Sequence, residues 1–186
     1  MTHSPRILKL DASGTPNKWV TYEEVAFHHA KGNILWTLGD LMTLRGGHNN
    51  EGIQSTLDVP SIMAVRGRMK MRQRSIIPLE KQSLFRRDRH TCAYCGNVFH
   101  EDQLRMEHIY PHARGGKLVW SNIVSACEPC NSRKACRTPE EARMPLLYVP
   151  YVPDAFEGFI LTNRRILADQ MEFLMAGVAK HSRLLL

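Results

Sequence analysis

Five cysteines have the spacing that most directly indicates chemistry. Four of them form two CxxC pairs, Cys92 with Cys95 and Cys127 with Cys130, while Cys136 stands apart. Two such pairs can present four thiolates to one tetrahedral zinc ion, which holds together a small domain with little core. Scattered buried thiols are the alternative, but they do not explain the paired spacing. We therefore predict a structural Zn²⁺ site.

The 31 residues between the two pairs exceed the usual separation in a zinc ribbon, so a functional segment is inserted there. This segment contains Glu107, His108 and His112 within the stretch EHIYPH. Histidines four residues apart could form a zinc site on a helix. Pro111 argues against a helix, and the order of residues is not the HExxH of metalloproteases. His112 is predicted instead to contact phosphate or support the site, with a simply exposed side chain as the alternative.

A family resemblance rests on several motifs in a fixed order. RRDRHTCAYCG, EHIYPHARGG, WSNIVSACEPCNSRK and RTPEEA, between Leu84 and about Met144, closely resemble the HNH endonuclease family. The resemblance implies a ββα-metal fold, in which a hairpin carries the acidic residue and the histidine. A loop then supplies the middle asparagine, and a helix supplies the last ligand. The N-terminal arrangement is more weakly similar to bacterial and phage HNH proteins with a short leading domain.

The resemblance also implies roles for four residues. His108 would be the general base that activates water, and Asn122 would brace the metal loop and help to orient the histidine. Glu107 and Asn131 would hold the catalytic metal. Glu107 stands where most members have aspartate, and Asn131 where histidine is common. With one carboxylate in an oxygen site, Mg²⁺ or Mn²⁺ is expected to bind weakly without DNA.

This chemistry is consistent with elementary requirements. Cleavage of a phosphodiester needs a nucleophilic water, a base for its proton and positive charge on the phosphate and departing oxygen. A histidine that is neutral near physiological pH suits the base role. Adjacent strand residues point to opposite faces, so Glu107 and His108 require a bend at the strand end, and Pro111 would favour one.

Positive charge is concentrated in one segment. The net charge is +7, and residues 66–90 contain nine Lys or Arg against two acids, while the rest of the chain is balanced. Every second residue from 66 to 74 is cationic, so one face of a strand could follow a phosphate backbone; a solvated edge strand is the alternative. The predicted nucleic-acid contacts are Arg66, Arg68, Lys70, Arg72, Arg74, His112, Arg114, Arg133 and Lys134.

Hydrophobic periodicity and capping residues predict the elements that position these residues. Thr21 with Glu24, and Thr138 with Glu141, form capping boxes, and Gly32 ends the first helix. The expected elements are strands at 6–10 and 33–37, a loop at 44–55, helices at 22–31, 79–87 and about 162–180, and an extended connector at 144–153.

The sequence thus predicts an α+β protein. Residues 1–77 form a small mixed unit with the basic strand, residues 78–145 the ββα-metal (HNH) nuclease core with its zinc site, and residues 146–186 a connector and C-terminal helix. The expected function is metal-dependent cleavage of DNA, most often double-stranded DNA. RNA is the less favoured substrate. A zinc-stabilised DNA-binding module with a decayed active centre is the alternative.

The start MTHSPRILKL resembles no secretion signal, and no apolar run could span a bilayer, so a cytoplasmic protein is expected. The helical stripe near the C-terminus predicts core packing, with a homodimer interface as the alternative.

Overall fold

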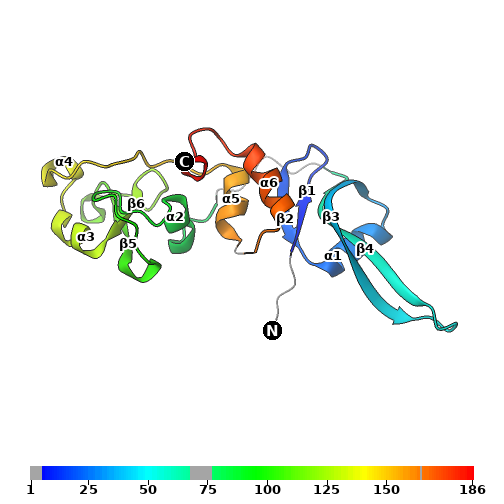
Figure 1. Cartoon of the computed structure of the whole chain (residues 1–186). Helices are drawn as coiled ribbons and strands as arrows, with labels where there is room; N and C mark the ends of the chain where they lie inside the picture. Colours follow the sequence, from blue (N-terminus) through cyan, green and yellow to red (C-terminus); the bar gives the residue numbers. More distant parts are fainter. Residues whose placement is uncertain (1–5, 68–76, 164) are drawn as a thin grey trace. The chain divides into compact units, whose positions relative to one another are not determined.

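A computed structural model describes residues 6–67, 77–163 and 165–186 of the chain (Figure 1). The chain divides into two compact units. The first comprises residues 1–75 and 163–177, and the second comprises residues 76–162 and 178–186. The segment after residue 145 is therefore shared between the two units.

The first unit is built on a four-stranded sheet. Its strand order is β2 (Pro16–Val20), β1 (Ile7–Leu10), β4 (Gln54–Val65) and β3 (Ile34–His48). β1 is antiparallel to β2 and parallel to β4, while β3 and β4 form an antiparallel hairpin. Helix α1 (Tyr22–Ala30) covers a core that includes Ile7, Val25 and Met63. The predicted capping box of Thr21 and Glu24 is confirmed.

The β3–β4 hairpin corrects the prediction of a loop at 44–55. Both strands continue into this region, where Arg45 pairs with Thr56 and His48 with Gln54. The turn is narrow because the Asn49 side chain accepts hydrogen bonds from the backbone N–H groups of Glu51 and Ile53. The glycines favour a loop in the sequence, but Gly46 and Gly47 lie within β3, where the register shifts between Arg45 and His48, and only Gly52, with a φ of +80°, lies in the turn.

The basic strip lies largely outside the described residues. β4 ends at Val65, and Arg66 is exposed in a bend. Arg68, Lys70, Arg72 and Arg74 lie outside the described residues, so the phosphate-tracking strand stays a prediction.

The C-terminal region contains two helices where sequence periodicity predicted one over 162–180. α5 (Ala155–Thr162) belongs to the second unit and α6 (Ala168–Gly177) to the first. Between them the Asn163 side chain accepts a hydrogen bond from the N–H of Arg165, a local turn that competes with helix. In α6 the buried Gln170 amide donates to the carbonyls of Arg6 and Ser61, both at 2.8 Å. Part of α6 is thus packed against its own unit, and dimerisation through it stays a prediction.

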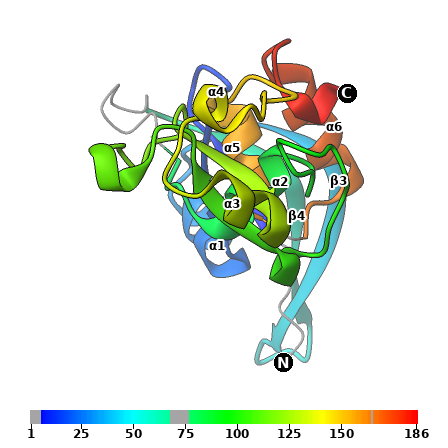
Figure 2. The ribbon, with the colours of Figure 1, turned by 90° about the vertical axis from the view of Figure 1, so that its left-hand side faces the viewer.

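The second unit contains the predicted ββα arrangement, whose strands and helix are labelled in Figure 1 and whose helix α3 is labelled again in Figure 2. Strands β5 (Leu104–His108) and β6 (Ile123–Cys127) pair antiparallel, and α3 (Glu128–Lys134) follows directly and packs against both. The core includes Leu84, Leu104, Trp120 and Ile123. The remaining elements are α2 (Lys81–Arg87), α4 (Pro139–Ala142) and the 3-10 helices Glu101–Gln103, His112–Arg114 and Arg183–Leu185. The α+β class and the capping box of Thr138 and Glu141 are confirmed.

A buried arginine joins the parts of this unit. Arg87, at the end of α2, is fully buried and forms an ion pair with the equally buried Asp88. Its guanidinium also donates to the carbonyls of Trp120, Ile123 and Tyr151 at 2.8–2.9 Å. Asp88 in turn accepts the N–H of Ser125 in β6. One of the cations counted in the basic segment is therefore neutralised inside the fold and contributes little to the surface field.

Candidate metal centre and catalytic pocket

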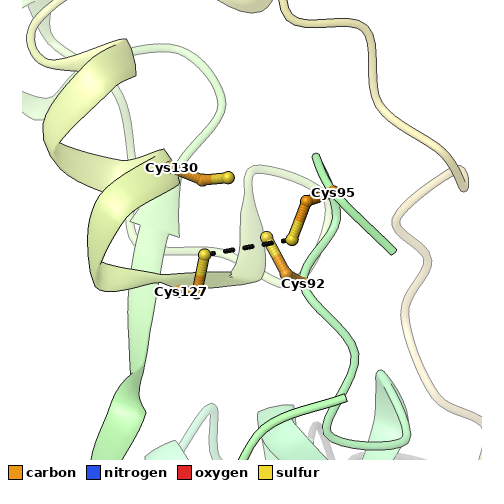
Figure 3. Close-up of side chains that lie close together, drawn as sticks. All are labelled: Cys92, Cys95, Cys127 and Cys130. Carbon is orange, nitrogen blue, oxygen red and sulfur yellow. Dashed lines mark hydrogen bonds between the residues drawn. The ribbon is translucent and has the colours of Figure 1, made fainter. Parts of the chain in front are cut away.

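The four paired cysteines converge in the second unit (Figure 3). All four Sγ atoms lie within 4.8 Å of one another, and those of Cys95 and Cys127 are 4.0 Å apart. Tetrahedral zinc with Zn–S bonds of about 2.3 Å places sulfur atoms about 3.8 Å apart. The cluster thus has the donor type and spacing that a structural zinc ion requires, as the two CxxC pairs predict.

Local backbone geometry brings these thiols together. In the first pair the N–H of Gly96 donates to the carbonyl of Cys92, and Gly96 has a φ of +75°, which favours glycine. In the second pair Cys127 is the N-cap of α3 and Cys130 lies one turn later. The end of β6 and the start of α3 are therefore fixed by the same cluster.

A pocket of about 370 Å³ lies beside this helix. Of the four residues predicted to act in catalysis or to hold the catalytic metal, three line it, namely Glu107, His108 and Asn131. Glu107 and His108 share one pocket although they are adjacent on β5, which ends at His108. The other lining residues are Pro111, His112, Ala113, Lys134, Ala135 and Cys136.

His108 has the environment of a neutral imidazole. Its Nε2 atom is buried and has no hydrogen-bond partner within the described part of the chain. Burial lowers the pKa of His108, and the nearby His112 and Lys134 lower it further, against the opposing effect of Glu107. The His112 ring lies edge-on with its centroid 5.5 Å from that of His108. A histidine of this kind is available to accept a proton at neutral pH.

Asn122 lies outside the pocket lining and braces the loop after β5. Its Oδ1 accepts the N–H of Tyr110 at 2.9 Å, and its Nδ2 donates to the carbonyls of Tyr110 and Lys117. Its own carbonyl accepts the N–H of Ile109, next to His108. At Gly116 the backbone approaches Tyr110 so closely that a Cβ would lie 1.9 Å from its carbonyl oxygen. The loop thus depends on the asparagine amide and on a glycine.

Lys134 is placed differently from the sequence expectation. We predicted it among the cations that contact nucleic acid, but its side chain is fully buried. The ammonium donates to Glu107 Oε1 at 2.5 Å and to the carbonyl of His108 at 2.7 Å. Lys134 is therefore an internal partner of the pocket and is not exposed to a phosphate. Nothing in the sequence distinguishes it from the neighbouring Arg133, which is exposed.

The other predicted contacts remain at the surface. Arg114 forms an ion pair with Glu141 in which Nη1 donates to both carboxylate oxygens, at 2.7 and 2.9 Å. Both side chains are partly exposed. His112 and Arg133 are exposed near the pocket. Sequence reasoning also missed the exposed Cys136 in the pocket lining, because its distance from the CxxC pairs gave it no role.

Comparison with known proteins locates the similarity in this unit. Residues 92–147 match the family model described as HNH endonuclease, which covers less than a third of the chain. A search of curated proteins found no match. Across the described residues, no helix has the length and apolar character needed to cross a bilayer. The match supports a nuclease-type function with a nucleic acid as substrate. With its four-cysteine cluster and its ββα elements, the segment from residue 92 to residue 147 therefore has the sequence and fold features of an HNH endonuclease domain.

Proposed function

We propose that this protein is an endonuclease that hydrolyses phosphodiester bonds of DNA with a divalent cation, and that the pocket is its active centre. One observation carries the proposal. A histidine, a carboxylate and an amide line a single pocket within the segment that matches HNH endonucleases. DNA is favoured over RNA by the resemblance stated above, and RNA is a second substrate for the test.

His108 is proposed as the general base. Its Nε2 atom has no hydrogen-bond partner among the described residues, so in the tautomer protonated at Nδ1 it can accept a proton when substrate and water enter. The lowered pKa keeps the ring neutral at physiological pH, as proton abstraction from water requires.

Glu107 and Asn131 are proposed to hold the catalytic cation. Their oxygen donors suit Mg²⁺ or Mn²⁺ better than a thiol-seeking metal. Glu107 Oε1 is engaged by Lys134, whereas Oε2 has no hydrogen-bond partner among the described residues, which fits a ligand role. When bound, the cation supplies positive charge to the phosphate and the departing oxygen.

Scaffold and pocket share helix α3. The helix carries Cys127 and Cys130 at its start and Asn131 and Lys134 further on. Seven residues are too few for a helix that is stable by itself, so the thiolate cluster would hold the ligands of the pocket in place. Asn122 would act indirectly, by fixing the loop that follows His108.

The proposed DNA-binding surface consists of exposed cations near the pocket. Arg133, His112 and Arg114 are candidates, and Arg114 would exchange its carboxylate partner for phosphate. Arg66 and the strip at 68–74 are further candidates. Lys134 is not part of this surface.

The test is cleavage of supercoiled plasmid with and without Mg²⁺ or Mn²⁺, beside a single-stranded RNA of matched length. The variant His108→Ala should lose ~100- to 10,000-fold in rate, the usual contribution of a general base. Its zinc content and DNA affinity should stay at the wild-type level. The matched control His100→Ala removes an exposed histidine outside the pocket and should cleave normally.

Two outcomes would contradict the proposal. If His108→Ala cleaves within threefold of the wild type, the base is another group, and His112 is the next candidate. If the wild type binds DNA and cleaves neither substrate with either metal, the protein is a zinc-stabilised binding module.

A further inference from the structure

We propose that Lys134 is a positioning residue of this site, which fixes the Glu107 carboxylate through one oxygen and weakens the binding of the divalent cation. The inference rests on the proposed function, because Glu107 is there a metal ligand. It concerns a residue that the sequence places only among the nucleic-acid contacts.

The position of Lys134 on α3 points to this role. Lys134 lies three residues after Asn131, so both side chains lie on the same face of the helix. Lys134 and Glu107 have side-chain exposures of 0% and 11%, so the pair is shielded from water and salt. Both residues nevertheless line the pocket, which places the ion pair at the site itself.

The contacts of the ammonium constrain two successive residues of β5. It holds Glu107 by Oε1 and His108 by its backbone carbonyl, 2.5 and 2.7 Å away. Glu107 has three rotatable side-chain bonds up to its carboxyl group and would otherwise sample several orientations. Since Oε1 accepts the ammonium hydrogen bond, Oε2 is the oxygen that we propose for a cation in the pocket. The ammonium therefore holds the carboxylate by one oxygen and ties its position to the backbone of His108.

The charge of the pair has a second consequence. A cation site with one carboxylate is already weak, and the ammonium cancels that formal charge at hydrogen-bond distance. Lys134 also repels a divalent ion directly. When Lys134 is removed, the affinity for the divalent cation should therefore rise, while turnover should fall because the carboxylate is less well oriented. A purely structural ion pair would not give this combination.

The experiment measures Mn²⁺ binding and cleavage separately in the full-length, zinc-loaded protein. Lys134→Met should bind Mn²⁺ at least tenfold more tightly, as followed by electron paramagnetic resonance of the free ion. Its turnover at saturating Mn²⁺ should fall about 10- to 100-fold, since a ligand misplaced by about 1 Å costs that much. Lys180→Met, which removes an exposed lysine from the same unit, should leave both quantities unchanged.

Two further variants keep the inference testable if Lys134→Met folds poorly because an uncompensated carboxylate is buried. Lys134→Gln retains an N–H donor without the charge, and it should tighten Mn²⁺ binding while losing less turnover than the methionine variant. In a Glu107→Gln background, Lys134→Met should change Mn²⁺ affinity and turnover less than threefold, because its effect passes through Glu107.

Three results would overturn the inference. They are unchanged Mn²⁺ affinity in both Lys134 variants, turnover within threefold of the wild type in Lys134→Met, and additive effects in the double variant. A wild-type protein that neither binds Mn²⁺ nor cleaves nucleic acid would overturn the proposed function as well. A wild type that does both, with unresponsive Lys134 variants, would overturn the role of Lys134 alone.

Discussion

Replacement of Arg87 by methionine should strongly destabilise the nuclease unit without changing the cleavage rate of the molecules that remain folded. The change removes the ion partner of the fully buried Asp88 and the donor to the buried carbonyls of Trp120 and Ile123. Breaking a buried ion pair costs about 3–5 kcal/mol, and each unsatisfied buried acceptor costs about 1–3 kcal/mol. The lower ends of these ranges give about 5 kcal/mol, comparable with the whole stability of many domains.

Unfolding of this unit can be followed selectively because the thiolate cluster lies within it. We would titrate zinc-loaded protein with urea and detect zinc release with a chromogenic chelator. Arg87→Met should lower the free energy of unfolding by about 5 kcal/mol, and Arg87→Lys by less, because it keeps the charge and loses the planar fork. Lys81→Met, an exposed change on the same helix, should stay within about 0.5 kcal/mol of the wild type.

Arg87 is not in the pocket lining, so cleavage per folded molecule should equal that of the wild type. A loss of less than 1.5 kcal/mol in Arg87→Met would refute the reasoning. So would a folded variant that binds zinc fully and does not cleave.

Two further predictions concern pH and thiols. The cleavage rate at saturating Mg²⁺ should rise with pH as His108 loses its proton. Because burial lowers the pKa of His108, this rise should be complete at a lower pH than for an ordinary imidazole, whose pKa is about 6.5. A pH–rate profile with its midpoint above that value would contradict this assignment. In zinc-loaded protein a thiol reagent should modify one of the five cysteines, the exposed Cys136 in the pocket, and all five after chelation. Rapid modification of two or more thiols before chelation would exclude a four-thiolate zinc site.

Much of the fold could be predicted from the sequence because its signals are local. The capping boxes at Thr21 and Thr138 need only residues three apart, and each precedes a helix in the structure. The two CxxC pairs bring donors together by short turns, so a metal cluster was predictable once they were counted. The ββα order followed from the family motifs. The hairpin of β3 and β4 was missed because glycines and asparagines indicate a turn, while strand pairing across it depends on residues far along the chain.

The sequence by itself determined which residue types are available to the site, namely Glu107, His108, Asn131 and four thiols. Only the tertiary structure decided the environment of each. Lys134 and Arg133 are adjacent cations, and the rotation of α3 buries the first against Glu107 and leaves the second exposed. Arg87 counted as one more positive charge until the packing of α2 against β6 enclosed it with Asp88. Burial and ion pairing depend on which segments meet across the core. No spacing along the chain encodes this information, because it arises when separate elements exclude water from between them.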